Sequence, residues 1–418
     1  MKSSSPAPAH RPSTLSPFKV HAFLALWLAA LASQVGNAVQ SVGASWMMTS
    51  LAPQADMVAL VQTAVSLPVM LLALIGGAVG DLFDRRRVML TAQVVMATAS
   101  LLLAALTFAG LITPWSLLAL TFVLGAGVAI FSPSMQVTVN EIMPRSELAG
   151  AVSLNVLGFN VARSVGPAIG GGIVAIGGSS AAFVATAFSY SVAVLILAFW
   201  RRPVTAAPAG DRPRRSIAKA IGEGLRYVAA APPIRIILIR AFTLTFAGAA
   251  AWALMPVVAR DLIGGGPSTL GFLLSGLGFG AVVGAALSTH VRHRFSNEAI
   301  VRGASIIFGL ACLVVASGPG LPVSFAALLI GGAGWVQALS GFSVSGQMWS
   351  PRPLVGRVGA TINSVIFGGL AVGAWFWGHV AEAVGIGSCL MLSGGLLIVL
   401  PAIGLLLPLP RNEDAPAV

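Results

Sequence analysis

Apolar stretches long enough to cross a membrane recur along the whole of this 418-residue chain. An α-helix needs about 20 predominantly apolar residues to span the hydrocarbon core of a bilayer. Stretches of this kind predict an all-α membrane protein with twelve transmembrane helices. We expect the spans at residues 20–48, 57–80, 88–110, 115–136, 149–176, 180–200, 236–260, 268–290, 298–318, 321–345, 358–383 and 387–408.

The distribution of charge supports a membrane protein. Charged residues are 9% of the chain, whereas a soluble domain carries about 25%. The net charge of +12 would suit a nucleic-acid-binding protein, but the basic residues gather in alternate connections, and the other connections hold only Arg260. The positive-inside rule explains this pattern, so we expect no nucleic-acid partner and both termini in the cytoplasm. The excess of arginine over lysine indicates a bacterium, and hence the inner membrane.

The two ends of the chain are predicted to be cytoplasmic tails. Residues 1–19 are rich in Ser and Pro and predict a disordered N-terminal tail, and residues 409–418 form the C-terminal tail. A signal peptide is the alternative, because Lys19 precedes the apolar run 22–32. The uncharged stretch continues to residue 55, which favours a first transmembrane helix.

A connection rich in Arg, Pro and Ala, at residues 201–235, divides the predicted spans into two groups of six. We expect an N-terminal six-helix bundle at 20–200, a cytoplasmic linker, and a C-terminal six-helix bundle at 236–408. An internal repeat supports the division, because an offset of 207 residues carries Gly125-Ala126-Gly127 onto Gly332-Ala333-Gly334.

The connection between the second and third spans reads GGAVGDLFDRRR over residues 76–87. It resembles the loop between helices 2 and 3 of the major facilitator superfamily, whose pattern is Gly-x-x-x-Asp-x-x-Gly-Arg-(Lys/Arg)-x-Arg. The positions that match are Gly77, Asp81, Arg85 and Arg86, while Asp84 replaces the second glycine of the pattern. The resemblance implies the major facilitator fold, in which two six-helix halves bind substrate between them near the bilayer midplane.

The same resemblance implies a conformational switch. In the superfamily, the aspartate of this loop meets the N-terminus of helix 11 and holds the cytoplasmic side shut, while the arginines pair with nearby acids. A carboxylate is favourable at the positive end of a helix. By this resemblance Asp81 is the latch, Arg85 a pairing cation, and Glu141 its plausible partner. The alternative is that these charges only fix the topology.

Span 5 carries Gly166-Pro167 followed by Gly170-Gly171, which resembles the Gly-Pro-x-x-Gly-Gly motif of exporting members of the superfamily. Such residues permit close helix packing and a local bend, and packing alone would also explain them. In the family the motif accompanies efflux by proton exchange. Longer stretches, such as MPRSELAGAVSLNVLGFNVARSVGPAIGG, resemble the branch that contains the enterobactin exporter and macrolide-efflux-like proteins.

Arg163 lies deep in span 5, where an arginine in hydrocarbon costs at least about 2.5 kcal/mol. We therefore expect it to face the central cavity and bind an anionic or phenolic group. The alternative is a structural cation that the carbonyls of spans 1 and 4 satisfy and that holds these helices together. Other substrate-binding candidates are polar residues of spans 1 and 5 and aromatic residues of the second half: Gln34, Asn37, Gln40, Asn160, Trp335 and Trp375. Lipid-facing packing is the alternative for each tryptophan.

No Asp or Glu lies deep inside a predicted span, which puts proton coupling in doubt. Coupling would then use Glu382, His379 or the substrate itself, and a histidine titrates near neutrality. Packing is the commoner role of a lone membrane histidine.

We expect a secondary active transporter that exports an amphipathic organic molecule, a siderophore or drug-like compound, as a monomeric proton antiporter. Metabolite uptake and a non-transporting receptor or scaffold are the alternatives. No catalytic constellation or ATP-binding motif is visible, so an enzyme is not expected. Cys312 and Cys389 lie in apolar stretches and predict no disulfide or metal site, and no cofactor is expected.

Overall fold

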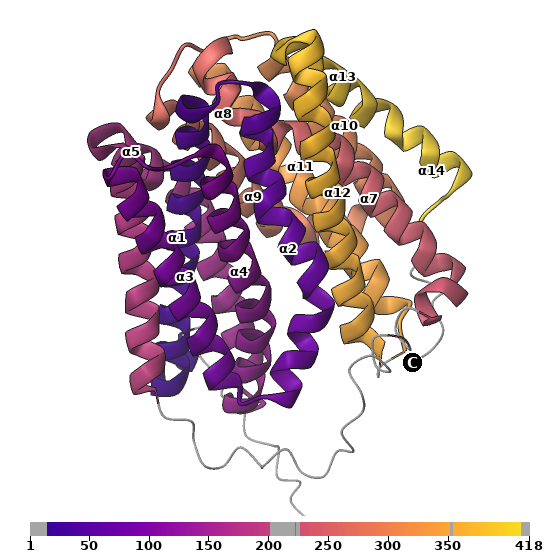
Figure 1. Ribbon diagram of the computed structural model, residues 1–418. Coiled ribbons are helices and arrows are strands. Elements are labelled where there is room, and N and C mark those ends of the chain that lie inside the picture. Colours follow the sequence, from indigo (N-terminus) through magenta and orange to yellow (C-terminus); the bar gives the residue numbers. More distant parts are fainter. Residues whose placement is uncertain (1–14, 201–221, 223–225, 352–353, 411–418) are drawn as a thin grey trace, which may run out of the picture.

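The computed structural model describes residues 15–200, 222, 226–351 and 354–410; for residues 74 and 76–82 it describes the backbone alone. Every regular element in this part of the chain is helical (Figure 1). The elements are η1 (Ser16–Lys19), α1 (His21–Leu51), α2 (Ala55–Leu82), α3 (Arg85–Phe108), α4 (Pro114–Ile142), α5 (Leu148–Phe199), α7 (Pro232–Ala253), α8 (Met255–Val257), η2 (Val258–Leu262), α9 (Pro267–Arg294), α10 (Asn297–Ala316), α11 (Leu321–Met348), α12 (Val355–Val384), α13 (Ile386–Val399), η4 (Leu400–Ala402) and α14 (Ile403–Leu406).

Eleven helical segments in the described residues are long and apolar enough to cross a membrane. One of them, α5, has 52 residues and would be about 78 Å long if straight, more than twice the hydrocarbon thickness. It is interrupted at Gly178, whose φ of 73° lies in the left-handed region that favours glycine. Counted on either side of Gly178, α5 supplies two spans, and the predicted twelve-span fold is confirmed.

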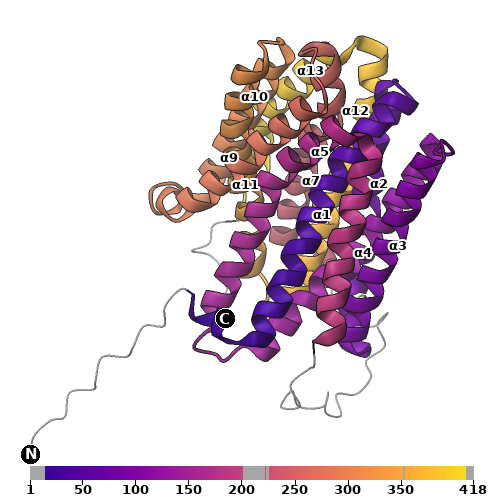
Figure 2. The same ribbon diagram turned by 90° about the vertical axis from the view of Figure 1, so that its left-hand side faces the viewer.

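The helices form two groups. In Figure 1 the indigo-to-magenta helices α1, α3 and α5 lie on the left and α7, α10, α12, α13 and α14 lie on the right, with α8 and α9 seen toward the middle. Viewed from the side in Figure 2, α9, α10 and α11 lie away from α2, α3 and α4. The groups meet along two helix pairs, α2 with α12 and α5 with α9. We call them the first and second halves.

The internal repeat marks equivalent contacts in the two halves. A Cβ added at Gly125 of α4 would lie 2.7 Å from the carbonyl oxygen of Val65 in α2. A Cβ at Gly332 of α11 would lie 2.2 Å from the carbonyl oxygen of Leu277 in α9. Both positions therefore require glycine, because each helix touches the backbone of its neighbour.

Both ends of the described chain lie at one end of the bundle, which we call the terminal face; the other end is the opposite face. The predicted disordered tail is wrong at Ser16–Lys19, which form a helical turn. Pro17 is buried, and the centroid of the Phe18 ring lies 5.1 Å from that of Trp27 in α1. The turn is ordered because these two apolar side chains, Pro17 and Phe18, pack against the bundle. Leu409 is also buried in the predicted C-terminal tail. Residues 1–14, 411–418 and most of the predicted linker lie outside the described residues.

Candidate functional site

A cavity of about 800 Å³ lies between the two halves. It is lined by α1, α2 and α4, by Phe159 of α5, and by the first part of α12. Three of the predicted substrate-binding residues, Gln34, Asn37 and Gln40, line it from α1. They lie three residues apart and so share one face of the helix.

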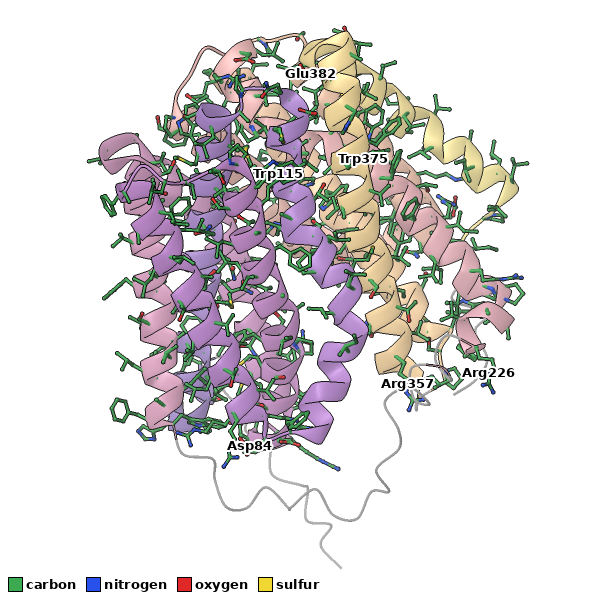
Figure 3. The ribbon with its side chains drawn as sticks, viewed as in Figure 1. Asp84, Trp115, Arg226, Arg357, Trp375 and Glu382 are labelled. Carbon is green, nitrogen blue, oxygen red and sulfur yellow. The ribbon has the colours of Figure 1, made fainter. Side chains whose placement is uncertain are left out.

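The cavity extends from the terminal face into the middle of the bundle. On α12 its lining begins in the first turn, at Gly356 and Arg357, and ends at Phe367. Figure 3 shows Arg357 at the terminal face and Glu382, at the far end of the same helix, at the opposite face. None of the lining residues belongs to the half of α12 beyond Phe367. The space between the halves therefore closes toward the opposite face.

Arg260 of η2 makes one of the contacts that close the opposite face. Its guanidinium donates hydrogen bonds to the carbonyl oxygens of Thr49 (3.0 Å) and Pro53 (3.1 Å) in the first half. Asp261 accepts two further hydrogen bonds, at 2.6 and 3.0 Å, and orients the guanidinium. The C-terminal carbonyls of α1 carry partial negative charge, so a cation is favourable there.

Glu382 makes a second contact at the opposite face. Its Oε2 accepts a hydrogen bond of 2.9 Å from the backbone N–H of Ala55, the first residue of α2. This N–H has no partner inside its own helix, and a carboxylate is favourable at a helix N-terminus. Close by, a Cβ added at Gly378 would lie 2.9 Å from the Cα of Asp56. The two helices therefore touch along their backbones at this end.

The predicted cavity-facing position of Arg163 is wrong in this conformation. Arg163 is not among the lining residues, and its Cζ lies 4.9 Å from the ring centroid of Trp252 in α7. A Cβ at Gly278 of α9 would lie 2.4 Å from the Arg163 carbonyl oxygen, so α5 and α9 are in contact at this depth. Arg163 thus joins the halves by a cation–π contact. Asn160, one turn earlier, also lies outside the cavity lining.

The two predicted tryptophans do not line the cavity either. Trp335 is 2% exposed and packs between Phe308 (4.9 Å) and Trp252 (6.1 Å) in the second half. Trp375 is half exposed and its ring lies 5.0 Å from that of His379. The pattern of apolar residues alone does not show which face of α12 packs against a neighbouring helix. In the structure Gly369 and Gly373 pack against α7.

His379 and Glu382 do not form a pair. His379 is exposed, and its Nδ1 lies 2.9 Å from the carbonyl oxygen of Trp375 in its own helix. Glu382 instead contacts α2 through Ala55. Of the two, only Glu382 joins the halves in the described contacts.

The residues of the predicted switch divide into two groups. For Gly77 and Asp81 the structure describes only the backbone, which belongs to α2, and the Asp81 carboxylate lies outside the described atoms. Arg85 forms an ion pair with Glu141, which joins α3 to α4. Arg86 donates to the carbonyl oxygens of Leu197 (3.0 Å) and Ala198 (2.5 Å) at the end of α5. Both arginines therefore bind within the first half.

Asp84, which replaces a glycine of the superfamily pattern, caps α3. Its carboxylate accepts a hydrogen bond of 2.9 Å from the backbone N–H of Arg87, the third residue of α3. Aspartate is among the preferred N-cap residues. This cap is a local role for the carboxylate at the start of α3.

The glycines of the span-5 motif pack against helices on both sides. Cβ atoms added at Gly166 and Gly170 would lie 2.5 Å from Ala38 Cβ and 3.0 Å from Val39 Cα, both in α1. A Cβ at Gly171 would instead lie 3.0 Å from the Cα of Gly271 in α9, and one at Gly271 would lie 2.5 Å from the Pro167 carbonyl oxygen. The motif therefore brings α5 close to its own half and to the other half.

Sequence reasoning missed several polar residues of the cavity. Arg357 was expected in a connection, but α12 begins at Val355, so Arg357 lies in its first turn and lines the cavity. The others come from α1, α4 and α12: Ser41, Thr121, Ser132, Gln136, Thr361 and Asn363. A polar residue inside an apolar span was the signal that could have found them. The prediction used this signal for Gln34, Asn37 and Gln40 but not for these residues.

Comparison with known proteins adds a family to this geometry. A family model described as "Transmembrane secretion effector", of the major facilitator type, matches residues 12–417. The multidrug efflux pump Tap of Mycolicibacterium fortuitum is 26% identical over 399 residues, which cover 94% of this chain and 97% of that one. The staphyloferrin A transporter of Staphylococcus aureus is 24% identical over 282 residues, covering 67% and 70%.

Solved structures show the same fold. A bacterial homolog of the human lysosomal transporter Spinster, in an inward-facing and unoccupied conformation, has a TM-score of 0.75 at 17% identity and covers 96% of this chain and 99% of its own. The inward-open xylose transporter XylE of E. coli has a TM-score of 0.71 at 13% identity, with coverage of 94% and 96%. These similarities extend over both halves.

Proposed function

The chain belongs to the transmembrane secretion effector family of the major facilitator superfamily, and on that premise we propose that it exports an amphipathic organic molecule by alternating access. The family consists of transporters, which agrees with the expectation that the chain is not an enzyme. A siderophore or drug-like cargo is supported by the relatives, which are named for multidrug efflux and for staphyloferrin A.

The cavity between the halves is the observation that carries this proposal. It reaches one face of the membrane bundle and is closed toward the other, as alternating access requires of one of its states. We propose that the terminal face is cytoplasmic, because the basic connections lie there. The described conformation is then inward-open, and cargo enters the cavity from the cytoplasm.

Release to the outside requires the opposite face to open. In this proposal Arg260 and Glu382 must leave the ends of α1 and α2, while the terminal face closes around Asp81. In each state, one face would thus be kept closed by a carboxylate between α2 and α12: Asp81 at the terminal face and Glu382 at the opposite face. The superfamily resemblance supports the role of Asp81, and the hydrogen bond to Ala55 supports that of Glu382.

Proton coupling and a monomeric state belong to the same proposal. Among the described contacts between the halves, Glu382 is the carboxylate that a proton would neutralise, and its loss of charge would weaken the contact with α2. An antiporter of this kind would take up a proton from outside as the opposite face opens.

Transport into inverted membrane vesicles tests the function. Vesicles with an imposed pH gradient, acidic inside, are given a labelled catecholate siderophore or a fluorescent lipophilic drug. We expect accumulation of one of them, and its loss when the gradient is collapsed. Vesicles without the protein are the control. Accumulation only in right-side-out vesicles would instead indicate uptake, and accumulation that survives collapse of the gradient would contradict proton coupling.

A further inference from the structure

The inner end of the cavity is built from polar side chains of α1 and α4. At 1.5 Å per residue, Gln40 lies about 28 Å along α1 from the terminal face, and Thr121 lies about 32 Å along α4 from the same face. Both line the cavity. They are therefore at similar depth, where the space between the halves ends.

Two of these side chains are buried without a partner. Gln40 is 4% exposed, and neither its Oε1 nor its Nε2 has a hydrogen-bond partner among the described residues. Thr121 is 2% exposed, and its Oγ1 likewise has none. A buried polar group left unpaired costs about 1–3 kcal/mol, so a ligand that pairs with these groups would bind more tightly.

Asn37, one turn before Gln40, is held in a fixed orientation. Its Oδ1 accepts a hydrogen bond of 2.7 Å from the hydroxyl of Tyr190, which is fully buried. The amide nitrogen of Asn37 is then left to donate toward the cavity that this residue lines. The inner end thus offers at least one acceptor and several donors.

The charges that line the cavity are far from this inner end. In the described lining the charged residue is Arg357, in the first turn of α12, only about 3 Å along that helix from the terminal face. No described lining residue is a carboxylate. An ammonium or carboxylate ion buried beside Gln40 would therefore lose its hydration without gaining a counter-ion, which is costly.

We infer that Gln40 and Thr121, with Asn37, form a subsite for an uncharged hydrogen-bonding group of the substrate, of the carboxamide type. Such a group carries a donor and an acceptor side by side, which matches the two unpaired atoms of the Gln40 side chain. This inference rests on the proposed function, since it takes the cavity as the substrate site. It adds the chemical class of the group that the inner end recognises.

A matched series of dansyl compounds tests it. Each has the same fluorophore and a five-carbon tether that ends in an acetamide, an ammonium, a carboxylate or a methyl group. Binding to the full chain in lipid nanodiscs is measured by fluorescence titration. We expect the Kd of the acetamide compound to be about tenfold lower than those of the methyl and ammonium compounds. Pairing a buried polar group changes a Kd by about a factor of ten.

Variants assign the selectivity to the subsite. Gln40→Leu should raise the Kd of the acetamide compound about tenfold and leave that of the methyl compound unchanged, and Thr121→Val should act in the same direction. Gln40→Glu should make the ammonium compound bind best. The matched control is Ser100→Ala, which removes another buried, unpaired hydroxyl that does not line the cavity. It should leave all four Kd values unchanged.

The possible failures are distinguishable. Equal Kd values for the acetamide and methyl compounds, tightest binding of the ammonium compound to the natural chain, or no effect of Gln40→Leu would overturn the subsite. The proposed function would stand in those cases if inverted vesicles still accumulated the compounds. Selective binding of the acetamide compound without accumulation would support the subsite and count against export.

Discussion

The carboxylate of Glu382, near the end of α12, accepts a hydrogen bond of 2.9 Å from the backbone N–H of Ala55, at the start of α2. The contact joins the halves at the face opposite the cavity mouth. It places negative charge at the positive end of a helix, an arrangement that contributes about 0.3–1 kcal/mol when exposed. A contact of this size is strong enough to bias a conformational equilibrium and weak enough to break in each cycle.

Glu382→Gln should favour opening of the opposite face. The variant removes the charge, so we expect the population of opposite-face-open molecules to rise about two- to fivefold, as loss of 0.3–1 kcal/mol implies. Spin labels at Leu111→Cys and Ser317→Cys, which are exposed on that face, report the opening as a longer distance. The buried Cys312 and Cys389 are first replaced by Ala. An unchanged distance distribution would show that the contact between Glu382 and Ala55 does not keep the opposite face closed.

Asp81→Asn should have the opposite effect. If Asp81 holds the terminal face shut, its neutralisation favours the conformation described here, with a shorter distance between the same labels. Asp84→Asn is the matched control, because it removes a nearby negative charge while asparagine can still cap α3 through the Arg87 N–H. We expect it to leave the distances unchanged. Equal effects of both variants would indicate a general charge effect instead of a latch.

Arg163→Met should also favour the opposite-face-open state. The variant removes a cation–π contact between α5 and α7, which contributes about 0.5–2 kcal/mol, so a shift of at least about twofold is expected. Trp252→Leu should produce a similar shift, and the double variant should add little to either. Fully additive effects would mean that the two side chains act independently. If Arg163→Met lost transport of the dansyl carboxylate compound alone, Arg163 would be a substrate-binding residue after all.

Gly171→Ala should destabilise the protein, whereas Gly172→Ala should not. A Cβ at Gly171 would lie 2.7 Å from the carbonyl oxygen of Pro267 and 3.0 Å from the Cα of Gly271, and backbone atoms move only with their helix. No atom lies within 4 Å of a Cβ at Gly172. We expect a loss of about 1–3 kcal/mol for the first variant, measured as a lower Tm in detergent. Equal Tm values for the two variants would show that α5 and α9 separate at little cost.

Much of the cavity on α1 was predictable. Gln34, Asn37 and Gln40 interrupt an apolar span, and polar groups in hydrocarbon are costly, so they must face protein or a cavity. The same argument misplaced Arg163, because an aromatic ring also accommodates a cation at that depth. It overlooked Arg357, because the start of α12 falls three residues before the predicted span.

The sequence by itself determined the fold class, the number of spans and the division into halves. The number of spans follows from the length and spacing of apolar stretches, because each stretch must match the thickness of the bilayer. The division into halves follows from the repeat in the chain. Only the tertiary structure decided which polar residues meet. The closure by Glu382 and Arg260 and the packing of Arg163 on Trp252 join helices from distant parts of the chain, and it is the assembled bundle that buries Gln40. The rotation of a helix that is apolar on nearly all sides is set by packing against its neighbours, and no periodicity in one segment records it.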